Sequence, residues 1–220
     1  MFGSSNVIFQ FRGVFGVPVQ IGSSIVLLVL LFLSFGTSTA QLLYNAIFLG
    51  MIIGSIYLHE LGHAWATLVQ GIPVRRIMIF GGGGFCERSR SATAGQEELI
   101  VAMGPIVNLG IWAVASLIWP YMPEGLLMWA VHLLAWVNLF LAIFNMIPVQ
   151  PLDGGKLFHL LLQRFISPDM ATRVAGGVGL AISVLWIPAM YLAYTKLGFL
   201  LFFIPPVGLH WQMLRHPQQR

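Results

Sequence analysis

Long apolar runs, separated by short polar loops, constrain this chain more than any other feature of its sequence. Of its 220 residues, 58% are hydrophobic and only 8% are charged, whereas an ordinary soluble domain carries about 25% charged residues. A water-soluble fold of this composition would expose large apolar patches, so a lipid bilayer is the expected solvent. The sequence therefore predicts a polytopic α-helical membrane protein, with residues 1–220 forming one transmembrane domain.

Six of the apolar runs are predicted to form membrane helices. A span needs about 20 apolar residues, and glycine, proline and charged residues end each run. Pro205 and Pro206 should break the sixth helix, because proline has no backbone N–H. The predicted ranges are residues 23–36, 42–69, 97–119, 126–147, 174–194 and 197–214.

The first of these helices is expected to be retained in the mature protein. Residues 38–40, Ser-Thr-Ala, resemble a signal-peptidase site. A signal peptide begins with a positively charged stretch, however, and Arg12 is the only basic residue among the first 22. We therefore interpret residues 23–36 as a membrane helix.

Two segments outside the apolar runs favour extended structure. Residues 1–22 show short apolar–polar alternation and contain glycines and Pro18, which predicts a strand-like segment at the membrane surface. Residues 72–86 combine β-branched and aromatic side chains with four consecutive glycines, which predicts a β-hairpin or small sheet. Within that hairpin, we expect Val74–Phe80 to present an open strand edge to which an extended peptide can add. A hairpin that only plugs the membrane surface is the alternative.

The basic residues indicate how such a chain crosses the membrane. With six spans, every Lys and Arg except Lys196 falls on the side of the N-terminus. Basic residues favour the cytosolic side, so both termini are predicted to be cytosolic, and a prokaryotic cell membrane is the expected location. The net charge of +4 is small and lies in loops, so no nucleic-acid partner is expected.

One motif, His59-Glu60-Leu61-Gly62-His63, lies inside the second apolar run. A helix turns about 100° per residue, so positions 59 and 63 lie about 40° apart on one face. Two imidazoles at this spacing can bind one metal ion, with Glu60 beside them to accept a proton from water. Ionisable residues are costly inside a membrane, and a metal ion is a compensating partner. The motif predicts one zinc ion per chain.

A catalytic zinc site usually takes three protein ligands. Asp153 is the best candidate for the third, because it follows the fourth apolar run in a stretch rich in proline and glycine. Such a break in a helix is tolerated where the backbone lines a polar cavity. An aspartate in a turn also caps helices, and both interpretations remain open at this point. His132 is expected to be a packed polar contact, and His159 to lie at the membrane interface.

A second motif, N-x-x-P-x-x-x-L-D-G, runs from Asn145 to Gly154. Together with H-E-L-G-H, it resembles the site-2 protease family of intramembrane zinc metalloproteases. Residues 16–20 and 81–85 are also similar to the surface strands of that family. The chain has no room for a PDZ domain between its second and third runs, nor for a C-terminal CBS pair, so it resembles a minimal member.

The resemblance implies roles for five residues. His59, His63 and Asp153 would bind zinc, and Glu60 would act as the catalytic acid and base. Asn145 would help to hold the substrate or its oxyanion, although a cap at the end of a helix is an alternative for this residue.

The expected function is the hydrolysis of peptide bonds in transmembrane or membrane-associated proteins near the cytosolic face, as in regulated intramembrane proteolysis. One alternative is an inactive relative that binds membrane helices, but the motif residues are intact. Another is a metal-ion transporter, which should show internal repeats and more intramembrane His or acidic residues than this sequence has. The expected partners are a membrane protein substrate and the bilayer.

Overall fold

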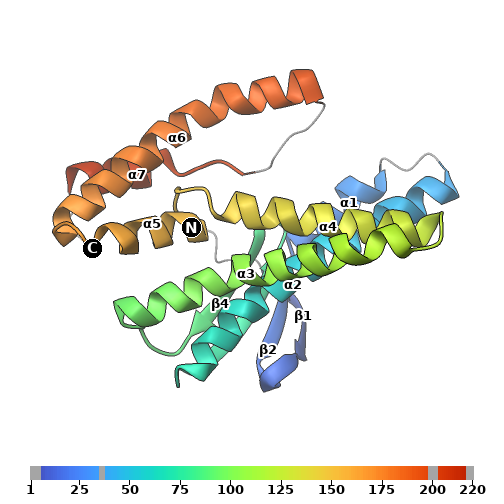
Figure 1. Ribbon diagram of the computed structural model, residues 1–220, viewed down its shortest axis with the longest axis horizontal. Coiled ribbons are helices and arrows are strands. Elements are labelled where there is room, and N and C mark those ends of the chain that lie inside the picture. The colour runs from blue at the N-terminus through green and yellow to red at the C-terminus, as the bar shows by residue number, and fades with distance from the viewer. Residues whose placement is uncertain (1–5, 35–37, 198–202, 217–220) are drawn as a thin grey trace. The chain divides into compact units, whose positions relative to one another are not determined.

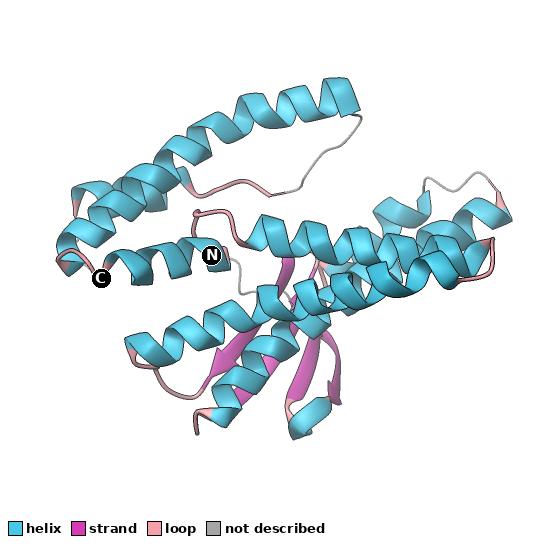
Figure 2. Ribbon diagram, in the orientation of Figure 1, coloured by secondary structure: helices cyan, strands magenta, loops and turns pink. Residues whose placement is uncertain are grey.

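A computed structural model of the chain describes residues 6–34, 38–197 and 203–216. Within these residues the fold is mostly helical with one small sheet (Figures 1 and 2). The chain packs as two compact units, Met1–Ile143 and Phe144–Arg220. The end of the first predicted span, residues 198–202 of the sixth, and both chain termini lie outside the described residues.

Four helices begin in the first unit, and local capping explains where two of them start. The Ser38 side chain accepts a hydrogen bond from the backbone N–H of Gln41 at 3.2 Å, so the second helix begins before the predicted residue 42. Thr93 and Gln96 form a reciprocal capping box, so the third begins before residue 97. These helices are α1 (Ile25–Ser34), α2 (Thr39–Val69), α3 (Ala94–Ile118), which runs into a 3-10 turn at Trp119–Tyr121, and α4 (Leu126–Asn145).

The second unit contains the end of α4 and three further helices. A short amphipathic helix precedes a long one, which extends beyond the predicted range of residues 174–194 at both ends. The helices are α5 (Asp153–Leu162), α6 (Pro168–Leu197) and α7 (Val207–Arg215). α6 and α7 pack against each other, and α5 contacts α6.

Six membrane spans are not confirmed. Of the described residues, four helices are long and apolar enough to cross a membrane, namely α2, α3 with its 3-10 turn, α4 and α6. α1 has 10 residues, about 15 Å of helix against a hydrocarbon core of about 30 Å. In the predicted sixth span, residues 203–206 are not helical and α7 has only 9 residues, because Pro205 and Pro206 cannot donate the N–H groups that a helix needs.

The strand segments at residues 1–22 and 72–86 join into one mixed sheet of order β1-β2-β3-β4. The outer pairs are antiparallel, whereas β2 and β3 are parallel, with Val19 opposite Ile77. A 3-10 turn at Val14–Gly16 connects the first two strands. The strands are β1 (Val7–Arg12), β2 (Pro18–Gly22), β3 (Val74–Phe80) and β4 (Gly83–Arg88).

The expectation that Val74–Phe80 offers an open strand edge is wrong. β3 pairs with β2 on one side and with β4 on the other, and Met78 and Ile79 are buried. The parallel partner β2 lies before α1 and α2 in the chain, and a local sequence pattern does not report such a distant pairing. The edge strand on this side of the sheet is β4.

The sheet packs against α2 and thereby sets the rotation of that helix (Figure 1). Ala64 of α2 forms a buried apolar cluster with residues of β2 and β3, including Val19 and Ile77. α3 packs against α2 as well, and its Ile100 clusters with Ala66. Since neighbouring helical residues point about 100° apart, a helix that directs Ala64 to the sheet can direct His59 and His63 to α3.

Candidate metal centre

His59 and His63 lie one helical turn apart on α2 and are buried. Their ring centroids are 4.7 Å apart with the planes nearly perpendicular, and their Nε2 atoms are 3.1 Å apart. The i, i+4 spacing that the motif predicts therefore brings one nitrogen of each ring to a common point.

The other ring nitrogens are held by α3. The Nδ1 atom of His59 lies 2.6 Å from Oδ1 of Asn108, and that of His63 lies 2.7 Å from the carbonyl oxygen of Ile100. The Ile100 carbonyl only accepts, so Nδ1 of His63 carries a proton and donates it, while its Nε2 keeps its lone pair. With Oδ1 of Asn108 facing it, Nδ1 of His59 donates in the same way. A metal-binding histidine has this arrangement, since the hydrogen bond at one nitrogen fixes the tautomer and the ring orientation.

These two Nε2 atoms fit a metal ion. Two lone pairs that point to one place repel each other unless a proton or a metal ion lies between them. Two nitrogens that bind one zinc ion tetrahedrally, at about 2.05 Å each, lie about 3.3 Å apart, close to the 3.1 Å found here.

Two glycines allow α3 to approach this site closely. A Cβ atom at Gly62 of α2 would lie 2.7 Å from the carbonyl oxygen of Met103. A Cβ atom at Gly104 of α3 would lie 2.5 Å from Nε2 of His63 and 2.6 Å from Nε2 of His59. Real Cβ contacts are longer than this, so only glycine at position 104 leaves room where the two nitrogens converge.

Glu60 is buried beside the histidines and lies against strand β4. A Cβ atom at Gly84 would be 2.7 Å from Cγ of Glu60 and 3.0 Å from its Oε1. The glycine-rich start of β4 thus makes space for the glutamate carboxyl group, and the edge strand lies next to it.

The single cysteine does not join this group. Burial, and secondarily the charge of Glu60, raise the pKa of Cys86 to about 12. Its sulfur therefore stays a protonated thiol, which is a poor metal ligand and a poor nucleophile.

Asp153 is the first residue of α5 and is buried. The N-cap of α5 is Leu152, so Asp153 is not the capping residue, although a carboxylate in the first turn favours the helix dipole. The preceding turn packs tightly against the start of α5, because a Cβ atom added at Gly155 would lie 2.5 Å from the carbonyl carbon of Val149. Asn145 is the last residue of α4 and is partly buried.

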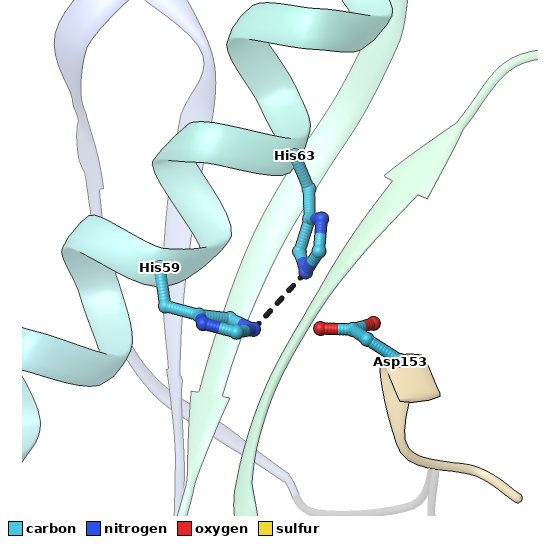
Figure 3. A group of neighbouring side chains, drawn as sticks. All are labelled: His59, His63 and Asp153. Carbon is cyan, nitrogen blue, oxygen red and sulfur yellow. Dashed lines mark hydrogen bonds between the residues drawn. The ribbon is translucent and has the colours of Figure 1, made fainter. Parts of the chain in front are cut away.

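Among the described residues, one group of three potential metal ligands is found, and it consists of His59, His63 and Asp153. Each offers one ligand atom, and the Nε2 atoms of the two histidines face each other in Figure 3. His132 and His159 have polar contacts elsewhere. Nε2 of His132 accepts a hydrogen bond from Trp136, and Nε2 of His159 lies 3.0 Å from the Thr172 hydroxyl.

The sequence motifs do not include the side chains that support the site, which are Asn108 of α3, Asn138 of α4 and Ser55 of α2. All three are fully or almost fully buried and hydrogen-bonded to one another. The available signal was a pair of amide side chains inside apolar runs, where polar groups are costly and are usually functional.

The fold and this ligand group define a membrane metalloprotein with an H-E-x-x-H helix. The sequence profile of Peptidase family M50 matches residues 47–125 and 119–186. This match spans more than half of the sequence, and the chain belongs to that family.

Individual relatives agree with this assignment. The chain is 30% identical over 217 residues to a Synechocystis protein named as a zinc metalloprotease, covering 91% of this chain and 54% of the relative. It is 22% identical over 173 residues to a zinc metalloprotease of Methanocaldococcus jannaschii, covering 78% of this chain and 50% of the relative. The chain thus spans about half the length of these relatives.

A solved structure shows the same fold. The site-2 protease from Methanocaldococcus jannaschii superposes with a TM-score of 0.66 at 19% identity. The superposition covers 96% of this chain and 94% of that structure.

Proposed function

We propose that this chain is an intramembrane zinc metalloprotease that cleaves transmembrane or membrane-associated proteins near the cytosolic face. The observation that carries the proposal is the convergence of two histidine Nε2 atoms beside Glu60, on a helix that is apolar enough to cross a membrane. The names of the Synechocystis and Methanocaldococcus relatives support zinc as the metal and proteolysis as the reaction.

The proposed ligands are His59, His63 and Asp153. Zinc bound there would polarise the peptide carbonyl and make water acidic enough to lose a proton near pH 7. Glu60 would accept that proton and return it to the leaving amine. The Asn145 amide would donate a hydrogen bond to the developing oxyanion.

Strand β4 is proposed to hold the substrate. A membrane helix hides its carbonyl groups in hydrogen bonds, so the scissile segment has to unwind, and each unpaired backbone group in lipid costs several kcal/mol. β4 is an edge strand, and Gly84 places its backbone beside Glu60. An extended substrate can add to such an edge through backbone hydrogen bonds.

The orientation follows from the distribution of basic residues. We propose that the chain crosses the membrane six times, as its apolar runs predict, so that the loops carrying most Lys and Arg residues and both termini are cytosolic, in a prokaryotic cell membrane. The site on α2 would then face the cytosolic half of the bilayer.

Glu60→Gln tests the proposed reaction. The amide keeps the shape of the carboxyl group but does not accept a proton, so cleavage should fall by about 10² or more while bound zinc stays near one ion per chain. The full-length protein is reconstituted in liposomes with a panel of single-span membrane proteins, and cleavage products and zinc content are measured. His63→Ala is the control that should lose zinc as well as cleavage.

Two results would contradict the proposal. An active Glu60→Gln enzyme would show that another group transfers the proton. Zinc flux across the liposome membrane, without cleavage of any substrate by the wild type, would favour a transporter.

A further inference from the structure

A hydrogen-bonded network of buried side chains connects α2, α3 and α4 next to His59. It consists of Ser55, Asn108 and Asn138, of which none exposes more than 1% of its surface. Polar groups between apolar helices are retained where they pair with one another or serve a site. Only Asn108 reaches an imidazole, so the other two residues need a separate explanation.

The two imidazoles are held in chemically different ways. The acceptor for Nδ1 of His63 is the backbone carbonyl of Ile100, which has no donor and therefore permits one neutral tautomer only. The acceptor for Nδ1 of His59 is the side-chain amide of Asn108. An amide has a donor end as well as an acceptor end, so Asn108 alone would suit either tautomer of His59.

The network removes this ambiguity, beginning at α4. Nδ2 of Asn138 donates to the backbone carbonyl of Leu134 at 2.9 Å and to Oγ of Ser55 at 2.9 Å. A backbone carbonyl only accepts, so the NH₂ end of Asn138 has to face Leu134. The Oδ1 end of Asn138 therefore faces Asn108.

The same logic orients the second amide. Nδ2 of Asn108 donates to Oδ1 of Asn138 at 2.7 Å and lies 3.4 Å from the backbone carbonyl of Ser55. Both are acceptors, so the NH₂ end of Asn108 points to them and its Oδ1 end points to His59. Reversing the chain of amides would set an oxygen of Asn138 against the Leu134 carbonyl.

We propose that Asn138 is a positioning residue that acts through Asn108 to hold His59 as its Nδ1–H tautomer, with the Nε2 lone pair directed at the metal site. Ser55 supports the orientation by accepting the second hydrogen bond of Asn138. The inference rests on the proposed role of His59 as a zinc ligand, and it assigns this role to a residue that does not touch the histidine.

The test is the tautomer of His59 in the full-length protein, with Asn138→Leu as the main variant. Protein labelled with nitrogen-15 histidine is prepared without zinc, and the ring nitrogen signals are measured by NMR. A His59→Gln variant assigns the His59 signals among the 6 histidines. Zinc affinity is measured separately by competition with a chelator.

In the wild type, His59 should show a single Nδ1–H tautomer. In Asn138→Leu, Asn108 loses the acceptor that orients it, so His59 should show both tautomers, while His63 stays unchanged on the Ile100 carbonyl. Zinc affinity should fall about 10- to 100-fold, as is usual when an outer partner of a metal ligand is lost.

Trp136→Phe is a matched control on the same helix. It removes one side-chain hydrogen bond, from Trp136 to Nε2 of His132 at 3.0 Å, without touching the network. The tautomers of His59 and His63 and the zinc affinity should be unchanged in this variant.

An unchanged His59 tautomer in Asn138→Leu would overturn the inference. Equal changes in the tautomers of His59 and His63 would overturn it as well, because they would indicate general loosening of the helices. If Asn138→Leu does not fold, Asn108→Leu serves in its place, and a persistent single tautomer there would be equally decisive. A wild type whose His59 signals do not respond to zinc would refute the proposed ligand role alone, because the tautomer comparison is made without zinc.

Discussion

Replacing Gly104 by alanine should abolish zinc binding without weakening the helix that carries it. The added Cβ atom would lie 2.5 Å from Nε2 of His63 and 2.6 Å from Nε2 of His59, in the space where the two nitrogens converge. An ordinary contact begins at 3.4 Å, so the ring nitrogens would have to retreat by about 0.8 to 0.9 Å, close to half of a zinc–nitrogen bond of about 2.05 Å.

The size of the effect follows from this displacement. Neither nitrogen could then reach a shared ion at bonding distance, and the loss should be at least 10²-fold in zinc affinity, which corresponds to about 2.7 kcal/mol. In a helix interior, alanine is more favourable than glycine by about 0.5–1 kcal/mol, so the intrinsic helix propensity of α3 should not fall.

The assay compares two alanine substitutions on the same helix. Gly110→Ala places its Cβ atom in open space, with no heavy atom within 4 Å. Zinc content after dialysis and zinc affinity by chelator competition should be lost in Gly104→Ala and kept in Gly110→Ala, with both variants retaining their helical circular dichroism. Wild-type zinc affinity in Gly104→Ala would refute the reasoning, because the metal would then have to lie elsewhere.

Three further predictions concern the topology, the edge strand and the pH dependence of stability. In a Cys86→Ser background, single cysteines at Glu124 and Thr195 should react with impermeant thiol reagents from outside the cell, and one at Ser91 should not; the reverse pattern would overturn the proposed orientation. Adjacent strand residues point their N–H groups to opposite edges, so proline at one of Phe85 and Cys86 should impair substrate cleavage while zinc stays bound, and alanine there should be milder. If neither proline has this effect, β4 does not hold the substrate. The hydrogen bond from Arg76, at 2.6 Å, lowers the pKa of Glu87 below its usual range. The ionised carboxylate therefore stabilises the folded protein fully at pH values well above its unfolded pKa of about 4.3, and this stabilisation is lost as the pH falls below that value. Thermal unfolding should show Glu87→Gln less stable than the wild type at pH 7 and the difference shrinking below about pH 4, and a difference that does not vary with pH would contradict this account.

Local features of this protein could be predicted from its sequence. The i, i+4 spacing places His59 and His63 on one face of a helix whatever surrounds that helix, and their Nε2 atoms do converge. The low charge content and the apolar runs likewise indicate a membrane protein, and four helices are apolar and long enough to cross a bilayer. Turn and strand composition predicted extended segments at residues 1–22 and 72–86, which are present as the four strands.

Features that join distant segments depended on the tertiary structure. β3 is an inner strand only because β2 pairs with it in parallel from before α1 and α2, and hydrophobic alternation within β3 does not encode that partner. The surroundings of the histidines likewise come from α3, through the Ile100 carbonyl, Gly104 and the Asn108 amide. Sequence periodicity records which residues share a face of one helix or strand. Packing between elements decides which residues of other elements contact that face. For His59, the contacts extend through Asn108 to Asn138 on α4.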